Sequence, residues 1–240
     1  MTDPYFLSEL ADPLPPVQTQ VDLAGPEGHH AAVVRRLRVG ERVVLTDGAG
    51  RGIRGPVSAT AKSGITVTVH EHLYAPVPAV RYVVAQALAK GDRFDLALEM
   101  LTEIGVIEVL PWMAQRSVVR WSAERGDKSL TKWRATVREA AKQSRRLRVP
   151  AVAEPRRDLT SEVRAAELVL VLHEEADLPL RDVRLPTAGS VLVVVGPEGG
   201  VTPSELTAMT DAGAVAVTLG DGVLRTSTAG VVAVAALMLR

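Results

Sequence analysis

The sequence predicts an α/β protein with two domains, a small β-rich domain over residues 1–73 and a larger α/β domain over residues 74–240. Three observations support this prediction. Before residue 73, short β-branched segments alternate with turn residues, as in a small barrel. After it, the continuous apolar runs Leu168–Leu172 and Val191–Val195 are typical of strands buried on both faces of a parallel sheet. Between the two, prolines at positions 76 and 78 favour an extended linker.

In the first domain, local signals predict a short helix over residues 28–36. Strands are expected over 42–46, 53–59 and 65–71, because these segments are rich in β-branched residues. Turns at 47–50 and 62–64, which contain Gly, Asp and Ser, separate them.

In the second domain, strand and helix signals alternate. The helices are predicted at 92–104, ended by Gly105, at 129–145, at 203–212 and at 229–239. Thr202 and Glu205 form a predicted capping box at the start of the third of these helices. The last helix is apolar on all sides, so we expect it to be fully buried. Further strands are predicted at 82–87, 106–110 and 215–219.

Composition limits the class of protein. Of the 240 residues, 47% are apolar and 23% are charged, which excludes a disordered or fibrous chain. The absence of cysteine excludes disulfides, cysteine nucleophiles and zinc–thiolate sites. The longest uncharged apolar run, 231–239, is far shorter than the ~20 residues that span a bilayer. The first ten residues do not resemble a secretion signal. We therefore expect a cytoplasmic protein without a membrane partner.

The net charge of zero conceals a strong asymmetry along the chain. Residues 1–75 sum to −1, residues 76–150 to +6 and residues 151–240 to −5. The densest basic stretch, 132–148, suits a polyanion such as RNA, although a solvated helix face is the alternative. Aromatic residues make up only 3% of the chain, so RNA binding is expected to depend on charge and shape rather than on base stacking.

Two glycine-rich loops follow predicted buried strands. Residues 196–200 follow one strand, and residues 220–222 follow another and lead to Arg225. Ligands of open α/β sheets bind at the carboxyl ends of strands, so the two loops predict one crevice. The first loop has neither a Rossmann nor a P-loop pattern. Three hydroxyl residues, 226–228, begin the last helix, and one of them is expected to cap it.

Other catalytic patterns are not supported. The five histidines have no metal-binding spacing of the H-E-x-x-H kind, so no metal is expected, even though His173 stands beside two glutamates. No serine lies in a G-x-S-x-G elbow, which leaves a hydrolase triad without support.

A family resemblance extends through nearly the whole chain. It rests on motifs in a fixed order: residues 30–40 with Asp47-Gly48, residues 90–93 with 102–106, Gln115-Arg116-Ser117 with 140–146, Gly196-Pro197-Glu198-Gly199-Gly200, and residues 224–229. In this order they resemble the RsmE-type methyltransferases of the SPOUT superfamily. That family often has Glu where Ser227 stands and a bulkier residue at Gly222.

The resemblance implies both fold and activity. It implies a PUA-like RNA-binding barrel, a SPOUT-type α/β domain with a deep trefoil knot, and a homodimer whose cofactor site lies near the subunit interface. It also implies an S-adenosylmethionine-dependent enzyme that methylates N3 of a uridine in 16S ribosomal RNA, within the small subunit. A ribose 2′-O-methyltransferase of the same superfamily is one alternative, although such enzymes usually carry Ser-Leu-Asn where Leu224-Arg225-Thr226 stands. A non-catalytic ribosome-assembly factor is another, but the intact glycine loops argue against it.

The resemblance also implies which residues form the site. Cofactor binding is expected at the ends of three loops, from Leu172, His173, Gly196, Pro197, Glu198, Gly199, Leu219, Gly220, Leu224, Arg225 and Thr226. RNA contacts are expected from Arg35, Arg36, Arg38, Arg116, Lys142, Arg145, Arg146 and Arg148.

The chemistry assigns roles to two of these residues. Uracil N3 carries a proton, so the site must help to remove it or stabilise the resulting anion. Glu198 is the first choice for a base, with binding of its own loop's amides as the alternative. Arg225 is the first choice for stabilising charge on a uracil oxygen or holding a phosphate.

Overall fold

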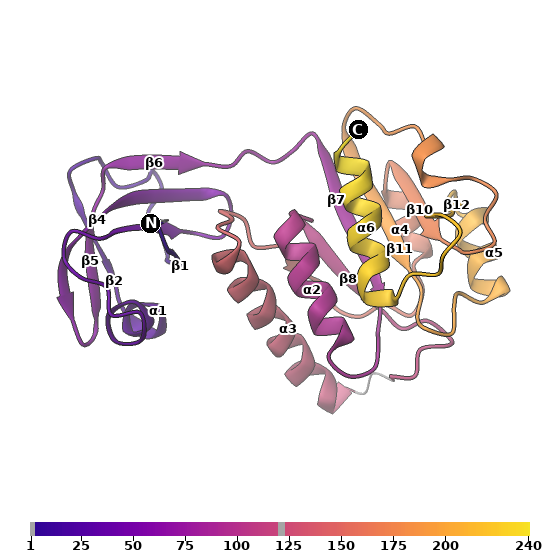
Figure 1. The fold of residues 1–240 in the computed structure, drawn as a ribbon, viewed down its shortest axis with the longest axis horizontal. Helices are drawn as coiled ribbons and strands as arrows, with labels where there is room; N and C mark the ends of the chain where they lie inside the picture. The colour runs from indigo at the N-terminus through magenta and orange to yellow at the C-terminus, as the bar shows by residue number, and fades with distance from the viewer. Residues whose placement is uncertain (1–2, 120–122) are drawn as a thin grey trace. The chain divides into compact units, whose positions relative to one another are not determined.

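The computed structural model describes residues 3–119 and 123–240, and the chain divides into two compact units (Figure 1). Unit 1 comprises Met1–Val77 and Ala141–Val149, and unit 2 comprises Pro78–Ala140 and Pro150–Arg240. The segment 141–149 thus belongs to the unit that the N-terminal residues form, although it lies far from them in sequence. In the described part of the chain, no helix is long and apolar enough to cross a membrane.

Unit 1 is built on a six-stranded sheet in which β1, β3, β4, β5 and β2 are neighbours in that order and β6 pairs with β4. Its strands are β1 (Tyr5–Leu7), β2 (Gln20–Leu23), β3 (Arg42–Thr46), β4 (Arg51–Ala61), β5 (Gly64–Thr68) and β6 (Glu71–Tyr74). β1 pairs with β3 in parallel and the other pairs are antiparallel. Buried side chains such as Phe6, Leu45 and Val67 form its core.

Two predictions for this unit need correction. The predicted helix at 28–36 is α1 (Gly25–His29), continued by the π-helix His30–Val34. It stops before Arg36, whose φ of 53° lies in the left-handed region. The predicted strand at 65–71 is two strands, because the chain leaves β5 after Thr68 and pairs with β4 again as β6.

Three glycines of unit 1 let the segment 147–149 lie against the turn between β3 and β4. Val149 N–H donates to the Gly48 carbonyl at 2.9 Å, and Gly50 N–H donates to the Leu147 carbonyl at 3.0 Å. A Cβ at Gly50 would lie 2.4 Å from Arg148 Nη2, and a Cβ at Gly52 would lie 2.8 Å from a Leu147 methyl. Larger residues at these positions would therefore push the basic segment away from the sheet.

Unit 2 contains a six-stranded sheet in the order β12-β10-β11-β7-β8-β9. The strands are β7 (Val80–Ala87), β8 (Glu108–Trp112), β9 (Ala151–Val152), β10 (Leu168–Leu172), β11 (Gly189–Val195) and β12 (Val215–Val217). Every pair is parallel, which confirms the prediction made from the apolar runs. All six carboxyl ends consequently point to one edge of the sheet, where ligands bind in folds of this type.

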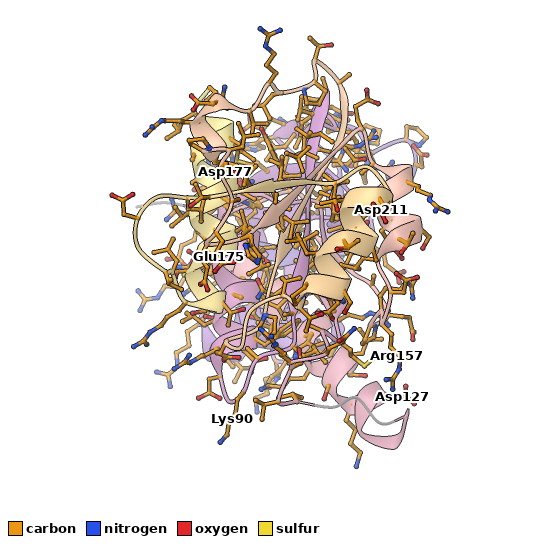
Figure 2. The ribbon with its side chains drawn as sticks, turned by 90° about the vertical axis from the view of Figure 1, so that its right-hand side faces the viewer. Lys90, Asp127, Arg157, Glu175, Asp177 and Asp211 are labelled. Carbon is orange, nitrogen blue, oxygen red and sulfur yellow. The ribbon has the colours of Figure 1, made fainter. Side chains whose placement is uncertain are left out.

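Helices cover both faces of this sheet. They are α2 (Arg93–Ile104), α4 (Thr160–Ala165), α5 (Pro203–Asp211) and α6 (Thr226–Met238), with a 3-10 turn at Leu180–Asp182. α3 (Ala123–Gln143) packs Trp133 against Phe94 of α2, and its residues 141–143 belong to unit 1. α2 and α6 pack together on one face, where α6 contacts β7 and β11 (Figure 1). On the other face, Val163 of α4 and Met209 of α5 join the core that Val83, Leu192 and Val194 form. Charged side chains such as Lys90, Arg157 and Asp211 lie at the periphery (Figure 2).

The predicted helix signals within unit 2 are confirmed at two places. Gly105 ends α2 with a φ of 93°, in the left-handed region that glycine adopts without strain. The capping box of α5 is present, because Thr202 Oγ1 accepts from Glu205 N–H and Glu205 Oε2 accepts from Thr202 N–H. The helix predicted at 129–145 instead runs from Ala123 to Gln143.

The prediction that the last helix is buried on all sides is wrong. Ala233 and Leu237 of α6 are buried, but Val232 is 44% exposed and Met238 is 41% exposed. Its composition is apolar all round because the exposed face carries valine, alanine and methionine instead of polar residues. α6 therefore presents an apolar face that the described part of this chain leaves uncovered.

Candidate functional site

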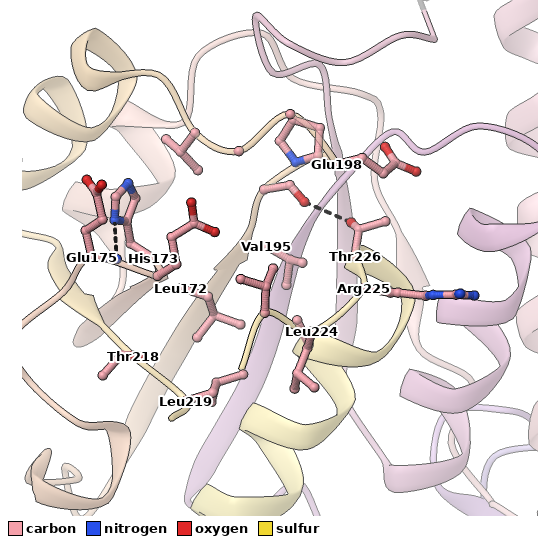
Figure 3. Close-up of a pocket in the computed structure, with 18 of the residues that line it drawn as sticks. Leu172, His173, Glu175, Val195, Glu198, Thr218, Leu219, Leu224, Arg225 and Thr226 are labelled. Atoms are coloured by element: carbon pink, nitrogen blue, oxygen red, sulfur yellow. Dashed lines mark hydrogen bonds between the residues drawn. The ribbon is translucent and has the colours of Figure 1, made fainter. Parts of the chain in front are cut away.

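A pocket of about 610 Å³ lies at the carboxyl edge of the sheet in unit 2 (Figure 3). Its floor includes Leu172, Val195 and Val217, which are the last residues of β10, β11 and β12. Its walls are the loops that follow these three strands. The size falls within the ~300–1,000 Å³ range of small-molecule sites.

The structure brings the predicted cofactor residues together. All eleven line this pocket: Leu172, His173, Gly196, Pro197, Glu198, Gly199, Leu219, Gly220, Leu224, Arg225 and Thr226. They come from three separate stretches of sequence, and the parallel topology is what unites them. Their role in binding stays a prediction, whereas their assembly into one cavity is a property of the fold.

The first glycine loop, 196–200, is compact because its glycines pack against protein. A Cβ at Gly196 would lie 2.9 Å from Val201 Cγ2, and a Cβ at Gly199 would lie 3.1 Å from Arg116 Cβ. Gly200 has a φ of 74°, which a side chain would strain. Gly199 therefore leaves room for Arg116.

Arg116, predicted to contact RNA, lies at the rim of this pocket. Its Nη1 donates to the Gly199 carbonyl at 2.9 Å. The adjacent backbone is anchored too, because Gln115 N–H donates to Glu205 Oε1 at 2.7 Å. The segment after β8 thus supports the first loop from outside, while the exposed guanidinium keeps further donors for a ligand.

The second loop leads to the start of α6, where the predicted hydroxyl cap is wrong. The residue at the N-cap position is Arg225, and it makes no side-chain capping bond. Thr226 Oγ1 instead donates to the Gly196 carbonyl at 2.8 Å, and Thr228 Oγ1 donates to the Arg225 carbonyl at 3.1 Å. Thr226 therefore ties the second loop to the first.

The charged groups of the pocket separate into two ends. In Figure 3, Glu198 and Arg225 lie on one side of Val195 and Thr226, and His173 and Glu175 lie on the other. At the second end, His173 Nδ1 accepts from the backbone N–H of Glu175 at 3.2 Å. The base and the cation proposed from the chemistry are thus on the same side.

Sequence reasoning missed Arg93 as a site residue. Arg93 is the first residue of α2 and lines the pocket, with Nη1 3.7 Å from Glu198 Oε1. Both side chains are partly exposed, at 43% and 34%, so water weakens their attraction. The available signal was topological: α2 follows β7, and a parallel strand delivers the next element to the same sheet edge as the glycine loops.

The other predicted RNA residues belong to unit 1. Arg35, Arg36 and Arg38 are exposed. Lys142 is less accessible, because its side chain is 8% exposed and Nζ lies 2.8 Å from Glu27 Oε1. Arg148 donates through Nε and Nη2 to the Ala75 carbonyl. Arg145 is exposed, and burial lowers the pKa of the Arg146 guanidinium.

Comparison with known proteins identifies the family. Residues 76–238 match the model of the RNA methyltransferase domain, and residues 23–69 match that of the RNA methyltransferase PUA domain. The chain belongs to this RNA methyltransferase family. The predicted fold class, an α/β methyltransferase domain with a PUA-like N-terminal domain, is thereby confirmed, and the trefoil knot stays a prediction.

Three relatives illustrate the similarity. Ribosomal RNA small subunit methyltransferase E of Mycobacterium tuberculosis is 47% identical over 231 residues, which cover 94% of this chain and 88% of the relative. The protein of the same name from Bacillus subtilis is 28% identical, covering 90% of this chain and 88% of the relative. The crystal structure of that of Neisseria gonorrhoeae, bound to S-adenosyl methionine, superposes with a TM-score of 0.86 at 28% identity, covering 99% of this chain and 98% of the other.

Proposed function

We propose that this protein transfers a methyl group from S-adenosylmethionine to N3 of a uridine in 16S ribosomal RNA of the small subunit. The observation that carries the proposal is that one pocket, at the carboxyl edge of the parallel sheet, gathers every residue expected to bind the cofactor. Family membership and the relatives' names support the reaction class.

The residues of the pocket fit this cofactor. Leu172, Leu219 and Leu224 offer apolar surface to an adenosine, and the glycine loops bring backbone groups within reach of its polar atoms. The carboxylates Glu174 and Glu175 suit the cofactor's cationic amino group. When bound, S-adenosylmethionine supplies an electrophilic methyl group on a sulfonium.

The chain's own groups act on the uracil. N3 must lose its proton as the N–C bond forms, and in this proposal Glu198 accepts it, because Glu198 lies on the same side of the pocket as Arg225. Arg225 stabilises the negative charge that develops on a uracil oxygen, assisted by the amino-terminal dipole of α6. The carboxylate of Glu198 contacts Arg93. This contact favours a role for Glu198 in the open pocket over the alternative, in which Glu198 binds the backbone amides of its own loop.

RNA binds to unit 1 as well as to the pocket rim. The N-terminal part of unit 1 has one more acidic than basic residue, and the four basic residues of 141–149 raise the unit's net charge to +3. Arg35, Arg36, Arg38 and Arg145 are exposed cations of unit 1. Such a surface suits phosphates, and Arg116 contacts the target nucleotide at the rim of the pocket in unit 2.

A second copy of the chain covers the apolar face of α6. Val232 and Met238 are exposed on that helix, and Val223, 77% exposed, lines the pocket just before it. A homodimer that buries this face would place the cofactor site beside the subunit interface.

Because the proposed substrate is ribosomal RNA, we also propose a cytoplasmic location.

Mass spectrometry of ribosomal RNA from a strain that lacks the gene tests the proposal. A 3-methyluridine should disappear from 16S RNA and return when the wild-type gene is restored. Loss of a 2′-O-methylated nucleotide instead would assign the chain to the ribose-modifying enzymes. An unchanged set of modifications, with defective subunit assembly, would indicate a non-catalytic factor.

A further inference from the structure

Gln86 is a polar side chain in an otherwise apolar part of the sheet. It lies on β7, is 1% exposed, and pairs in register with Val195, the residue that precedes the first glycine loop. It does not line the pocket. Buried polar side chains normally have partners that explain their presence.

The partners of Gln86 form a directed chain of hydrogen bonds. Its Nε2 donates to Thr226 Oγ1 at 3.0 Å and to the Thr226 carbonyl at 3.2 Å. Thr226 Oγ1 uses its own proton for the Gly196 carbonyl, at 2.8 Å. The Thr226 hydroxyl must therefore accept its second hydrogen bond from Gln86. Only a group with two N–H or O–H donors, such as an amide, can donate to both the hydroxyl and the carbonyl oxygen of Thr226.

The packing around Gln86 keeps α6 close to the sheet. Gly230 faces this point, since a Cβ there would lie 3.1 Å from Val195 Cγ2 and 3.6 Å from Gln86 Oε1. Gln86 Oε1 itself is buried and has no hydrogen-bond partner among the described residues. An apolar side chain of the same length would avoid this unsatisfied acceptor, so the fold gains little from glutamine unless its two donors matter.

We propose that Gln86 is a positioning residue of the cofactor site, an inference that rests on the proposed function. Through Thr226 it ties the start of α6, and with it the second loop, to Gly196 in the first loop. Both loops line the same pocket, and they adjoin where Thr226 Oγ1 meets the Gly196 carbonyl. Gln86 thus holds the two loops in one arrangement before the cofactor arrives, which lowers the entropic cost of binding.

The variant Gln86→Met tests the inference, because it keeps the length of the side chain and removes both donors. Loss of these bonds should weaken S-adenosylmethionine binding by roughly tenfold in calorimetry. The KM for the cofactor should rise by a similar factor, and kcat at saturating cofactor should fall by less than KM rises, because bound cofactor holds the two loops. Gln86→Glu should be more damaging, because its carboxylate would face the Thr226 carbonyl.

Variants of Thr226 test whether Gln86 acts through this residue. Thr226→Ser keeps the hydroxyl and should bind the cofactor nearly as well as wild type, whereas Thr226→Val should match Gln86→Met. The double variant Gln86→Met/Thr226→Val should be scarcely weaker than either single one, because both break the same chain. Additive losses would overturn the inference.

Thr102→Val provides a matched control. Thr102 is also fully buried, and its hydroxyl donates to the Leu98 carbonyl within α2, away from the pocket. This variant should change thermal stability without changing cofactor affinity. Equal loss of affinity in Thr102→Val, or wild-type affinity in Gln86→Met, would overturn the positioning role.

Hydrogen exchange separates this inference from the proposed function. In the cofactor-free protein, Gln86→Met should speed exchange at the amides of 196–200 and 225–229, and Thr102→Val should not. If wild-type protein failed to bind S-adenosylmethionine, the proposed function would fail, and the exchange data would still decide whether Gln86 holds the two loops. Unchanged exchange at both loops would refute the tie itself.

Discussion

Removing the side chain of Arg225 should slow methyl transfer without loosening the fold. Arg225 is exposed, lies at the N-cap position of α6, and caps the helix through no side-chain bond. Arg225→Ala should therefore change the free energy of unfolding by no more than about 0.5 kcal/mol. Loss of a preorganised donor that stabilises charge in the transition state typically slows the reaction ~10²–10³-fold. Because solvent screens the exposed Arg225, we expect the methyl-transfer rate to fall ~10²-fold.

Single-turnover methylation of small ribosomal subunits, beside a calorimetric titration with S-adenosylmethionine, measures this effect. Arg225→Ala should lose turnover and keep its cofactor affinity, which separates the transition state from the ground state. Arg225→Lys should recover little, because an ammonium does not reproduce the planar guanidinium. Arg157→Ala, at an exposed arginine outside the pocket, is the matched control (Figure 2). Full turnover in Arg225→Ala would remove this residue from the mechanism, and joint loss of affinity and turnover would assign it to the cofactor.

Three further predictions test other parts of the molecule. Gly199→Val should weaken cofactor binding by displacing Arg116, since even a single Cβ would lie 3.1 Å from that side chain; an unchanged calorimetric Kd in the folded variant would contradict this. Burial raises the pKa of Glu108 above its ordinary value of 4.5, and nearby Arg156 reduces this shift. Ionisation of Glu108 therefore destabilises the folded protein as the pH rises above 4.5. Glu108→Gln should therefore raise the unfolding midpoint at neutral pH and lose that advantage below pH 4.5, whereas a pH-independent difference would exclude this cause. Replacing Arg35, Arg36 and Arg38 with glutamine should flatten the slope of log K for RNA binding against log salt concentration, by about 0.7–0.9 per lost phosphate contact. An unchanged slope would mean that these exposed arginines are solvated and do not contact phosphates.

Local signals were enough to predict much of unit 2. The capping box of Thr202 and Glu205 and the stop at Gly105 depend on residues close in sequence, and the structure has both. The apolar runs of β10 and β11 correctly indicated buried parallel strands. From parallel strands followed by glycine loops, a crevice at the carboxyl edge follows directly.

Features that depend on distant residues were not predictable in this way. Nothing near residues 147–149 in sequence indicates that they lie against Gly48 and Gly50, because that pairing joins segments about a hundred positions apart. The exposure of Val232 depends on which elements cover α6, and an apolar composition does not specify them. Hydrophobic periodicity describes a segment, whereas burial is set by its neighbours.

Gln86 is an instructive omission, because a signal was present. A single amide within the apolar stretch 83–89 marks a buried polar position, and such a position needs partners. The sequence does not say that Thr226 is that partner, since the two residues meet only after β7, β11 and α6 have packed.

The most direct test of the account is methyl transfer in vitro with isotopically labelled S-adenosylmethionine. Purified protein would be incubated with small ribosomal subunits from a strain that lacks the gene, and the RNA would be digested to nucleosides for mass spectrometry. The label should appear in 3-methyluridine from 16S RNA, and Gly199→Val should abolish or sharply reduce it. Label at a ribose 2′-oxygen, or none with wild-type protein that binds the cofactor, would contradict the proposed reaction.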